Sequence, residues 1–142
     1  MTRPRWVLDT NVLVSALLWQ GKPGRLIEAA GEQRIRLCTS RAMLDELEAT
    51  PNKKKLARAV AATGSTAADM LARYGRIATV VRARRLREPV SRDADDDAVL
   101  ACALAARAGA VVTGDDDLLV LERFEGIAII GVQQALALLE SS

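Results

Sequence analysis

The sequence comprises 142 residues, of which 50% are hydrophobic and only 3% aromatic, and it carries a formal net charge of +2. A chain of this length fits one domain, residues 1–142, and buries roughly 68–70% of its unfolded surface on folding, so its core needs no disulfide or structural metal. Histidine is absent. This excludes histidine-based acid–base catalysis and most zinc sites, and it leaves carboxylates as the obvious catalytic groups.

The net charge conceals an uneven distribution along the chain. Seven of the 18 acidic residues lie within two short stretches, residues 93–97 and 115–117, and outside them 20 basic residues stand against 11 acidic ones. A basic body with a concentrated acidic spot favours a polyanionic partner that approaches a bound cation, although exposed arginines are also ordinary solubilising residues.

The two cysteines and the hydropathy pattern indicate an intracellular protein. Cys38 and Cys102 each lie in apolar surroundings and are not spaced as a metal motif, so we expect two buried thiols in a reducing compartment. No apolar run is long enough for a signal peptide or a membrane span. We therefore expect a cytoplasmic protein without membrane contact.

Five short apolar segments alternate with segments of helical pattern. In chain order, we expect a strand at 5–8, a helix at 12–18, a turn at 21–24, a helix at 25–31, a strand at 35–38, a helix from about 40 to 50, two alanine-rich helices between 52 and 75, a strand at 77–81, a basic loop at 82–92, a helix at 95–108, a strand at 110–113, a short helix at 115–121, a strand at 127–130 and a helix at 132–140. Continuously apolar strands that alternate with helices predict a parallel sheet covered on both faces. The expected fold is a three-layer α/β/α domain around five parallel strands.

Residue types at the helix ends predict the capping groups. Thr10 or Asn11 is expected to cap the first helix, and Thr39 or Ser40 the helix that follows the second strand. Gly109 is expected to end the helix at 95–108 in a left-handed conformation.

Polar residues follow the expected strands at the edge where open parallel sheets bind their ligands. They are Asp9 and Asn11 after the first strand, Ser40 after the second with Glu46 in the helix beyond it, Thr113, Asp115 and Asp117 after the fourth, and Asp93 and Asp97, four residues apart on one helix face. Any one of these acids also fits a helix cap or a partner for a helix dipole, each worth about 0.3–1 kcal/mol. Their common placement predicts one acidic site.

Several carboxylates in one place repel each other, and some would take up protons unless a cation compensated them. Hard divalent cations with oxygen ligands, Mg²⁺ or Mn²⁺, are the natural counterions. Such ions activate water and stabilise the charge of a phosphoryl transition state, a chemistry that requires neither histidine nor cysteine.

Four segments in register resemble the motifs of PIN-domain nucleases. They are residues 8–12, 40–47, 93–101 and 112–119, and the glycine-containing turn at 21–24 matches as well. The most similar subgroup is formed by the VapC-like toxins of bacterial and archaeal toxin–antitoxin pairs. The resemblance implies five parallel strands, metal-dependent endoribonuclease activity, a homodimer, and inhibition by a small antitoxin that inserts into the active-site groove.

Carried onto this chain, the resemblance implies a role for each acid. The catalytic metal-site acids are Asp9, Glu46, Asp97 and Asp115, with Asp117 as an auxiliary metal ligand. Asn11, Thr113 and Ser40 are expected to orient these ligands or the attacking water through hydrogen bonds. The resemblance does not settle the roles of Asp93 and Asp96.

Two basic segments are less typical of the family. The run Lys53, Lys54 and Lys55 and the arginines Arg84 and Arg85 of the 82–87 loop are candidate RNA phosphate contacts. A solvated surface face is the other interpretation of both segments.

These patterns together predict a Mg²⁺- or Mn²⁺-dependent endoribonuclease, the toxin of a type II toxin–antitoxin pair, that hydrolyses RNA with metal-activated water. One alternative is a catalytically inactive PIN-fold module that binds RNA or protein. Another is a phosphotransfer domain of similar architecture. That class requires a lysine after a later strand, whereas the lysines here are Lys22 and residues 53–55.

Overall fold

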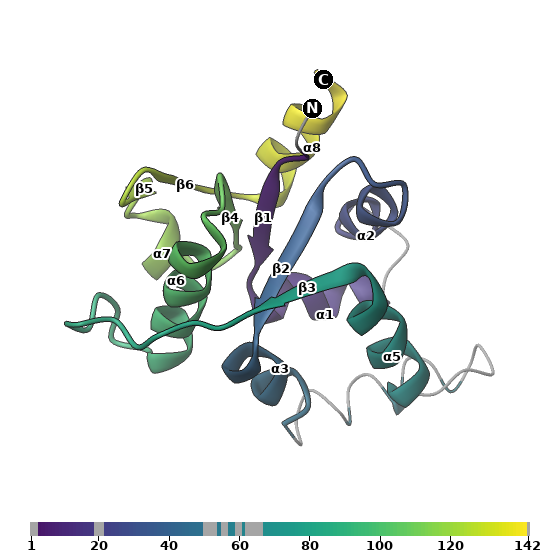
Figure 1. Cartoon of the computed structure of the whole chain (residues 1–142). Coiled ribbons are helices and arrows are strands. Elements are labelled where there is room, and N and C mark those ends of the chain that lie inside the picture. The colour runs from purple at the N-terminus through teal and green to yellow at the C-terminus, as the bar shows by residue number, and fades with distance from the viewer. Residues whose placement is uncertain are drawn as a thin grey trace.

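The computed structural model describes residues 3–18, 22–49, 54, 57–58, 61 and 67–141 (Figure 1). The strands are β1 (Arg5–Leu8), β2 (Arg36–Ser40), β3 (Ala78–Val81), β4 (Ala110–Val112), β5 (Arg123–Phe124) and β6 (Ile127–Ile130). The helices are α1 (Thr10–Leu18), α2 (Gly24–Gly31), α3 (Arg41–Leu47), α5 (Ala67–Ile77), α6 (Ala94–Ala106), α7 (Asp116–Leu119) and α8 (Val132–Glu140).

The strands form one sheet in the order β3-β2-β1-β4-β6-β5. The five expected strands are present and parallel to their neighbours, but the expected count of five is wrong because β5 adds a sixth, antiparallel strand beside β6. Glu125 and Gly126 both adopt positive φ angles, of 51° and 83°, and turn the chain tightly between β5 and β6. The two residues of β5 are too few to show the alternating pattern of a strand.

Helices cover both faces of the sheet, as the three-layer expectation required. Trp6 and Leu8 of β1 point to one face, where they pack against residues of α1, α2, α5 and α8. Val7 points to the other face and packs with residues of α6 and with Leu118 of α7. Figure 1 shows α6 and α7 on one side of β1 and α1, α2 and α5 on the other.

Helix α6 ends differently from the sequence expectation. Its C-cap is Arg107, which adopts the left-handed conformation (φ 53°, ψ 47°) that Gly109 was expected to take. Gly109 instead bonds to two strands of the sheet just before β4 begins: its amide donates to the Arg5 carbonyl at 2.8 Å, and its carbonyl accepts from the Ala128 amide at 3.1 Å. The helix must therefore end two residues earlier.

Part of the expected pattern lies outside the described residues. Of the two alanine-rich helices expected between 52 and 75, the structure describes α5 and only isolated positions before it, and Gly21 of the expected turn also lies outside. Within the described ranges, no helix combines the length and the apolar character that crossing a membrane would demand.

Candidate active site

Asp9 lies at the centre of the carboxyl edge of the sheet. Leu8 pairs with Val112 in the register of β1 and β4, so the residues that follow these strands, Asp9 and Thr113, are adjacent. The Thr113 hydroxyl donates a short hydrogen bond to the Asp9 carboxylate, and the Val12 amide donates to the other carboxylate oxygen at 2.8 Å. Asp9 therefore caps α1, a role that the sequence allowed for this acid as well as for Thr10 and Asn11, and it remains only 6% exposed.

Burial makes the negative charge of Asp9 costly. Desolvation raises the pKa of the Asp9 carboxyl above its ordinary value, and the nearby charge of Asp115 raises it further. The hydrogen bonds from Thr113 and Val12 act in the opposite direction but do not cancel this effect. A cation beside Asp9 would compensate the charge.

Three further carboxylates gather beside Asp9, from two different helices. One oxygen each of Asp96, Asp115 and Asp117 lies within 4.8 Å of the other two. Asp115 is the N-cap of α7 and accepts from the Asp117 amide at 2.9 Å. The Thr113 hydroxyl oxygen accepts from the Asp115 amide at 3.0 Å, so Thr113 connects Asp9 to this acidic triad.

Asp96 is the buried member of the acidic triad. Its side chain is 7% exposed, and desolvation together with Asp115 raises the pKa of Asp96 to about 6. The Ser91 hydroxyl donates to Asp96 at 3.0 Å and partly offsets this shift. A buried carboxyl whose pKa is raised to about 6 is stabilised by a bound proton or by a bound cation.

Asp97, which the sequence analysis expects among the metal-site acids, does not lie in the acidic triad. Its carboxylate accepts from the backbone amides of Val90, at 3.2 and 3.3 Å, and of Ser91, at 2.8 Å. The reason is helical periodicity. Asp96 shares its face of α6 with the buried residues Val99, Leu100 and Ala103, which are three, four and seven positions further on, whereas Asp97 lies about 100° around the helix.

Glu46 approaches the site from helix α3. Thr10 donates a hydrogen bond to Glu46 Oε2 at 2.8 Å. Burial raises the pKa of Glu46, and the charges of Asp95, Asp93 and Asp9 raise it further, against the effect of the Thr10 hydrogen bond. Glu46 therefore faces Asp9 and the first turn of α6.

The remaining expected site residues occupy supporting or exposed positions. Ser40 caps α3 by accepting from the Met43 amide at 3.3 Å, and Asp93 caps α6 by accepting from the Asp95 amide at 2.9 Å. Asn11 is exposed in the first turn of α1. Lys54, Arg84 and Arg85 are exposed, while Lys53 and Lys55 lie outside the described residues.

Sequence reasoning missed three residues of this site. Thr10 holds Glu46, Ser91 holds Asp96, and Arg92 Nη2 lies 3.6 Å from Asp117 Oδ1. The sequence gives no signal that separates Asp96 from Asp97, because residues 98–106 are apolar throughout and the positions three and four beyond either acid are equally hydrophobic. Ser91 and Arg92 lie in a loop and carry no periodic signal either.

The donor set fits a hard divalent cation. Carboxylate oxygens are the ligands that Mg²⁺ and Mn²⁺ prefer, and the two most buried acids, Asp9 and Asp96, have raised pKa values that a bound cation would lower. Thiol and imidazole ligands are not offered, since Cys38 and Cys102 belong to the core and the chain has no histidine. The site can therefore hold an oxygen-liganded ion beside an anionic substrate.

Comparison with known families agrees with this geometry. The sequence model of the PIN domain matches residues 5–117, more than half of the chain. The protein belongs to the PIN-domain family, whose members are generally metal-dependent nucleases. A search of curated proteins finds no match. Membership in this family removes the phosphotransfer alternative.

Proposed function

We propose that the protein is a Mg²⁺- or Mn²⁺-dependent endoribonuclease that hydrolyses RNA phosphodiester bonds. One observation carries the proposal: the acidic triad of Asp96, Asp115 and Asp117 lies beside buried Asp9 in a PIN domain. The four carboxylates come from the ends of β1 and β4 and from the starts of α6 and α7, which is the edge where parallel sheets bind ligands.

The residues of the site divide into cation ligands and residues that position them. Asp9, Asp96, Asp115 and Asp117 hold the cation, and Thr113 keeps Asp9 and Asp115 in register. Glu46, held by Thr10, orients the attacking water. Because water is the nucleophile, the 2′-hydroxyl is not required, and the family precedent implies that the P–O3′ bond breaks, which leaves a 5′-phosphate and a 3′-hydroxyl. When bound, the divalent ion supplies the charge that activates water and offsets the phosphoryl transition state. Asp97, the residue expected in the metal set, is assigned instead to the 90–91 loop that it holds.

The test compares two neighbouring aspartates in the same helix turn. Asp96→Asn is expected to abolish Mn²⁺-dependent cleavage of a fluorescent RNA and to remove the rise in melting temperature that Mn²⁺ gives the wild type. Asp97→Asn changes the same charge one residue away and is expected to keep both responses. Cleavage by the wild type in excess EDTA, or equal loss in both variants, would contradict the assignment.

The same titration separates the enzyme from an inactive PIN-fold module. A cation that binds only the folded protein stabilises it by RT ln(1 + [L]/Kd), about 2.7 kcal/mol at a hundredfold excess over Kd. An inactive module that has lost its metal site would show no shift in melting temperature with Mn²⁺ and no cleavage.

We further propose a biological setting for this activity: a cytoplasmic toxin that acts as a homodimer and is neutralised by a small antitoxin. The support is the resemblance of the four motifs to VapC-like toxins. Induced expression is expected to arrest growth of a bacterial host, and Asp96→Asn is expected to remove the arrest. Co-expression of a small protein encoded by an adjacent reading frame is expected to restore growth. That small protein is also expected to co-purify with this one. Arrest that persists with Asp96→Asn would exclude a nuclease toxin.

A further inference from the structure

The end of the sheet opposite the acidic site is rich in arginine. We call the end at which the neighbouring strands β2, β1 and β4 begin the amino edge. Figure 1 shows that β1 and β2 begin at the end of the sheet that lies away from α3. Within three residues of the starts of these three strands, the sequence places no acidic residue and five arginines: Arg3, Arg5, Arg34, Arg36 and Arg107. The amino edge and the carboxyl edge therefore carry opposite charges.

Two of these arginines lie side by side in the sheet. The register of β1 and β2 places Arg5 directly opposite Arg36, and neighbouring strands lie about 4.8 Å apart. Because side chains alternate along a strand, both arginines lie on the face of Val7 and Cys38, which α6 covers. Like charges directly opposite each other destabilise a sheet. We call Arg5 and Arg36 the arginine pair, and its two charges require compensation.

The chain itself offers the arginine pair little compensation. Both residues are half-buried. All 18 acidic residues of the sequence lie within the described ranges, and none of them forms a salt bridge with either arginine. Arg5 Nη1 donates to the Ala106 carbonyl at 3.2 Å, at the negative end of the α6 dipole. The Arg36 guanidinium has no hydrogen-bond or ion-pair partner among the residues that the structure describes.

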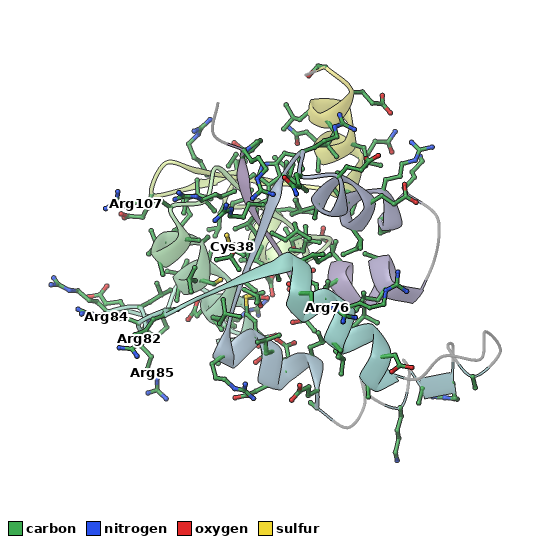
Figure 2. The ribbon with its side chains drawn as sticks, turned by 45° about the vertical axis from the view of Figure 1, so that its right-hand side comes forward. Cys38, Arg76, Arg82, Arg84, Arg85 and Arg107 are labelled. Carbon is green, nitrogen blue, oxygen red and sulfur yellow. The ribbon has the colours of Figure 1, made fainter. Side chains whose placement is uncertain are left out.

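The charges of the arginine pair act on the protein interior. Cys38 is 1% exposed, and desolvation raises the pKa of its thiol, whereas the charges of Arg5 and Arg36 lower it. Both guanidinium groups therefore lie near a buried side chain and are not free to extend into solvent. Figure 2 shows Cys38 inside the molecule and Arg107 projecting outward from its edge, well apart from the arginines of the segment after β3.

The donors of the amino edge suit a phosphate group. A guanidinium is planar and always charged, and its fork of five N–H donors matches the oxygens of a phosphate. A phosphate monoester carries about 1.5 to 2 negative charges at pH 7, which matches the two charges of the arginine pair. Arg107 directly follows Ala106, whose carbonyl binds Arg5, and adds an exposed third cation beside the pair.

We propose that the arginine pair binds a phosphate dianion at the amino edge, either orthophosphate or the phosphate of a monoester, with Arg107 at the rim of the site. This site lies at the opposite edge of the sheet from the acidic triad. It does not depend on the proposed nuclease function.

Nuclear magnetic resonance of isotope-labelled protein locates the site. The protein is titrated with sodium phosphate in EDTA at constant ionic strength, so that the metal-free carboxyl edge repels the anion. Saturable changes of amide chemical shift are expected to centre on residues 4–6, 35–37 and 106–109. The absence of a saturable change, or changes centred on the basic segment 82–87, would overturn the proposal.

One substitution at the arginine pair tests the contact. Arg36→Gln removes a charge without breaking a hydrogen bond of the described chain, and it is expected to weaken phosphate binding at least about tenfold. Arg36→Lys keeps the charge but loses the fork, so it should recover only part of the affinity. Arg84→Gln, which removes an exposed arginine elsewhere, is the matched control and should bind as the wild type does. Wild-type affinity in Arg36→Gln would overturn the proposal.

A second variant serves if Arg36→Gln does not fold, which its melting curve without phosphate shows. Arg107→Gln lies at an exposed position and is expected to weaken phosphate binding several-fold through the loss of one nearby charge. Equal affinity of Arg107→Gln and the wild type, with binding lost in Arg84→Gln, would place the phosphate elsewhere and reject the amino edge.

Comparison of ligands identifies the source of the phosphate. Tighter binding of adenosine 5′-monophosphate than of orthophosphate, with no binding of adenosine, would assign a monoester. Binding of orthophosphate alone would assign the free ion, and either result supports the site. Dimethyl phosphate, a diester with a single charge, is expected to bind at least about tenfold more weakly than orthophosphate. Equal binding of dimethyl phosphate would overturn the assignment of a dianion.

Discussion

The hydroxyl of Thr10 donates a 2.8 Å hydrogen bond to Oε2 of Glu46, and so joins the first turn of α1 to helix α3 across the carboxyl edge of the sheet. Thr10 is 5% exposed. The residue next to Asp9 in the chain therefore positions the acid that approaches the site from the opposite side.

Replacing Thr10 tests whether this bond positions Glu46. Thr10→Val keeps the shape of the side chain but removes the donor, so we expect the pKa of Glu46 to rise further and kcat to fall about tenfold, with KM little changed. The acidic limb of the pH–rate profile should move to higher pH. Thr10→Ser restores the hydroxyl and should restore both activity and profile. A Thr10→Val enzyme with the wild-type profile would show that the bond is merely structural.

The stability of the metal-free protein should depend on Asp96 in a defined direction. The pKa of Asp96 is about 6 in the folded protein and 3.8 ordinarily, so between these values the folded state holds a proton that the unfolded chain has released. The free energy of unfolding should therefore fall as pH rises from about 4 to 6, by up to about 1.4 kcal/mol per unit from this group. Denaturant unfolding in EDTA, with Asp96→Asn as the control, measures the difference. A wild-type curve parallel to that of Asp96→Asn would contradict the shift.

We expect Arg92 to compete with a bound cation for Asp117. Its side chain is 92% exposed and its guanidinium lies 3.6 Å from Asp117 Oδ1, so the pair is weak and open to solvent. Arg92→Ala should leave stability unchanged and tighten Mn²⁺ binding by about two- to fivefold, because one positive charge leaves the site. Calorimetric Mn²⁺ titration is the measurement, with Arg84→Ala as a control that removes the same charge elsewhere. Weaker Mn²⁺ binding by Arg92→Ala would indicate that Arg92 supports the ligands.

Helix α6 ends at a left-handed residue, Arg107. Replacing this residue should stabilise the protein without touching the acidic site. Arg107 has φ 53°, a conformation that costs a residue with a Cβ roughly 1–2 kcal/mol and glycine little. After allowing for the greater freedom of glycine in the unfolded chain, Arg107→Gly should raise the free energy of unfolding by up to about 1 kcal/mol. Cleavage should not change. Destabilisation in urea would show that the arginine side chain stabilises the helix end.

Much of the fold could be predicted from the sequence because the parallel strands are short, apolar runs. Residues 5–8 and 127–130 were predicted with the bounds that β1 and β6 have. Strand β5 escaped prediction because two residues carry no periodicity, and the α6 cap because Gly109 bonds to Arg5 and Ala128 of the neighbouring strands. These outcomes depend on tertiary contacts and not on local preference.

The candidate site could be predicted in composition but not in detail. Asp9 and Asp115 follow strands closely and Glu46 lies one to two helix turns beyond one, so the chain path alone brings them to one edge. The choice between Asp96 and Asp97 is a matter of direction around a helix. The sequence analysis expects Asp97 among the metal-site acids, whereas Asp96 is the residue that lies with Asp115 and Asp117. Thr10 and Ser91 hold their acids through hydrogen bonds that only three-dimensional structure shows.

The order of the strands has a consequence for synthesis of the protein on the ribosome. Strand β1 lies between β2 and β4, and Thr113 binds Asp9 across 104 residues of chain. A nascent chain that has emerged only as far as α5 lacks β4, Thr113 and the whole acidic triad, so Asp9 has no partner set with which to recruit an ion. The carboxylates that would hold an ion therefore come together only after nearly all of the polypeptide has been made.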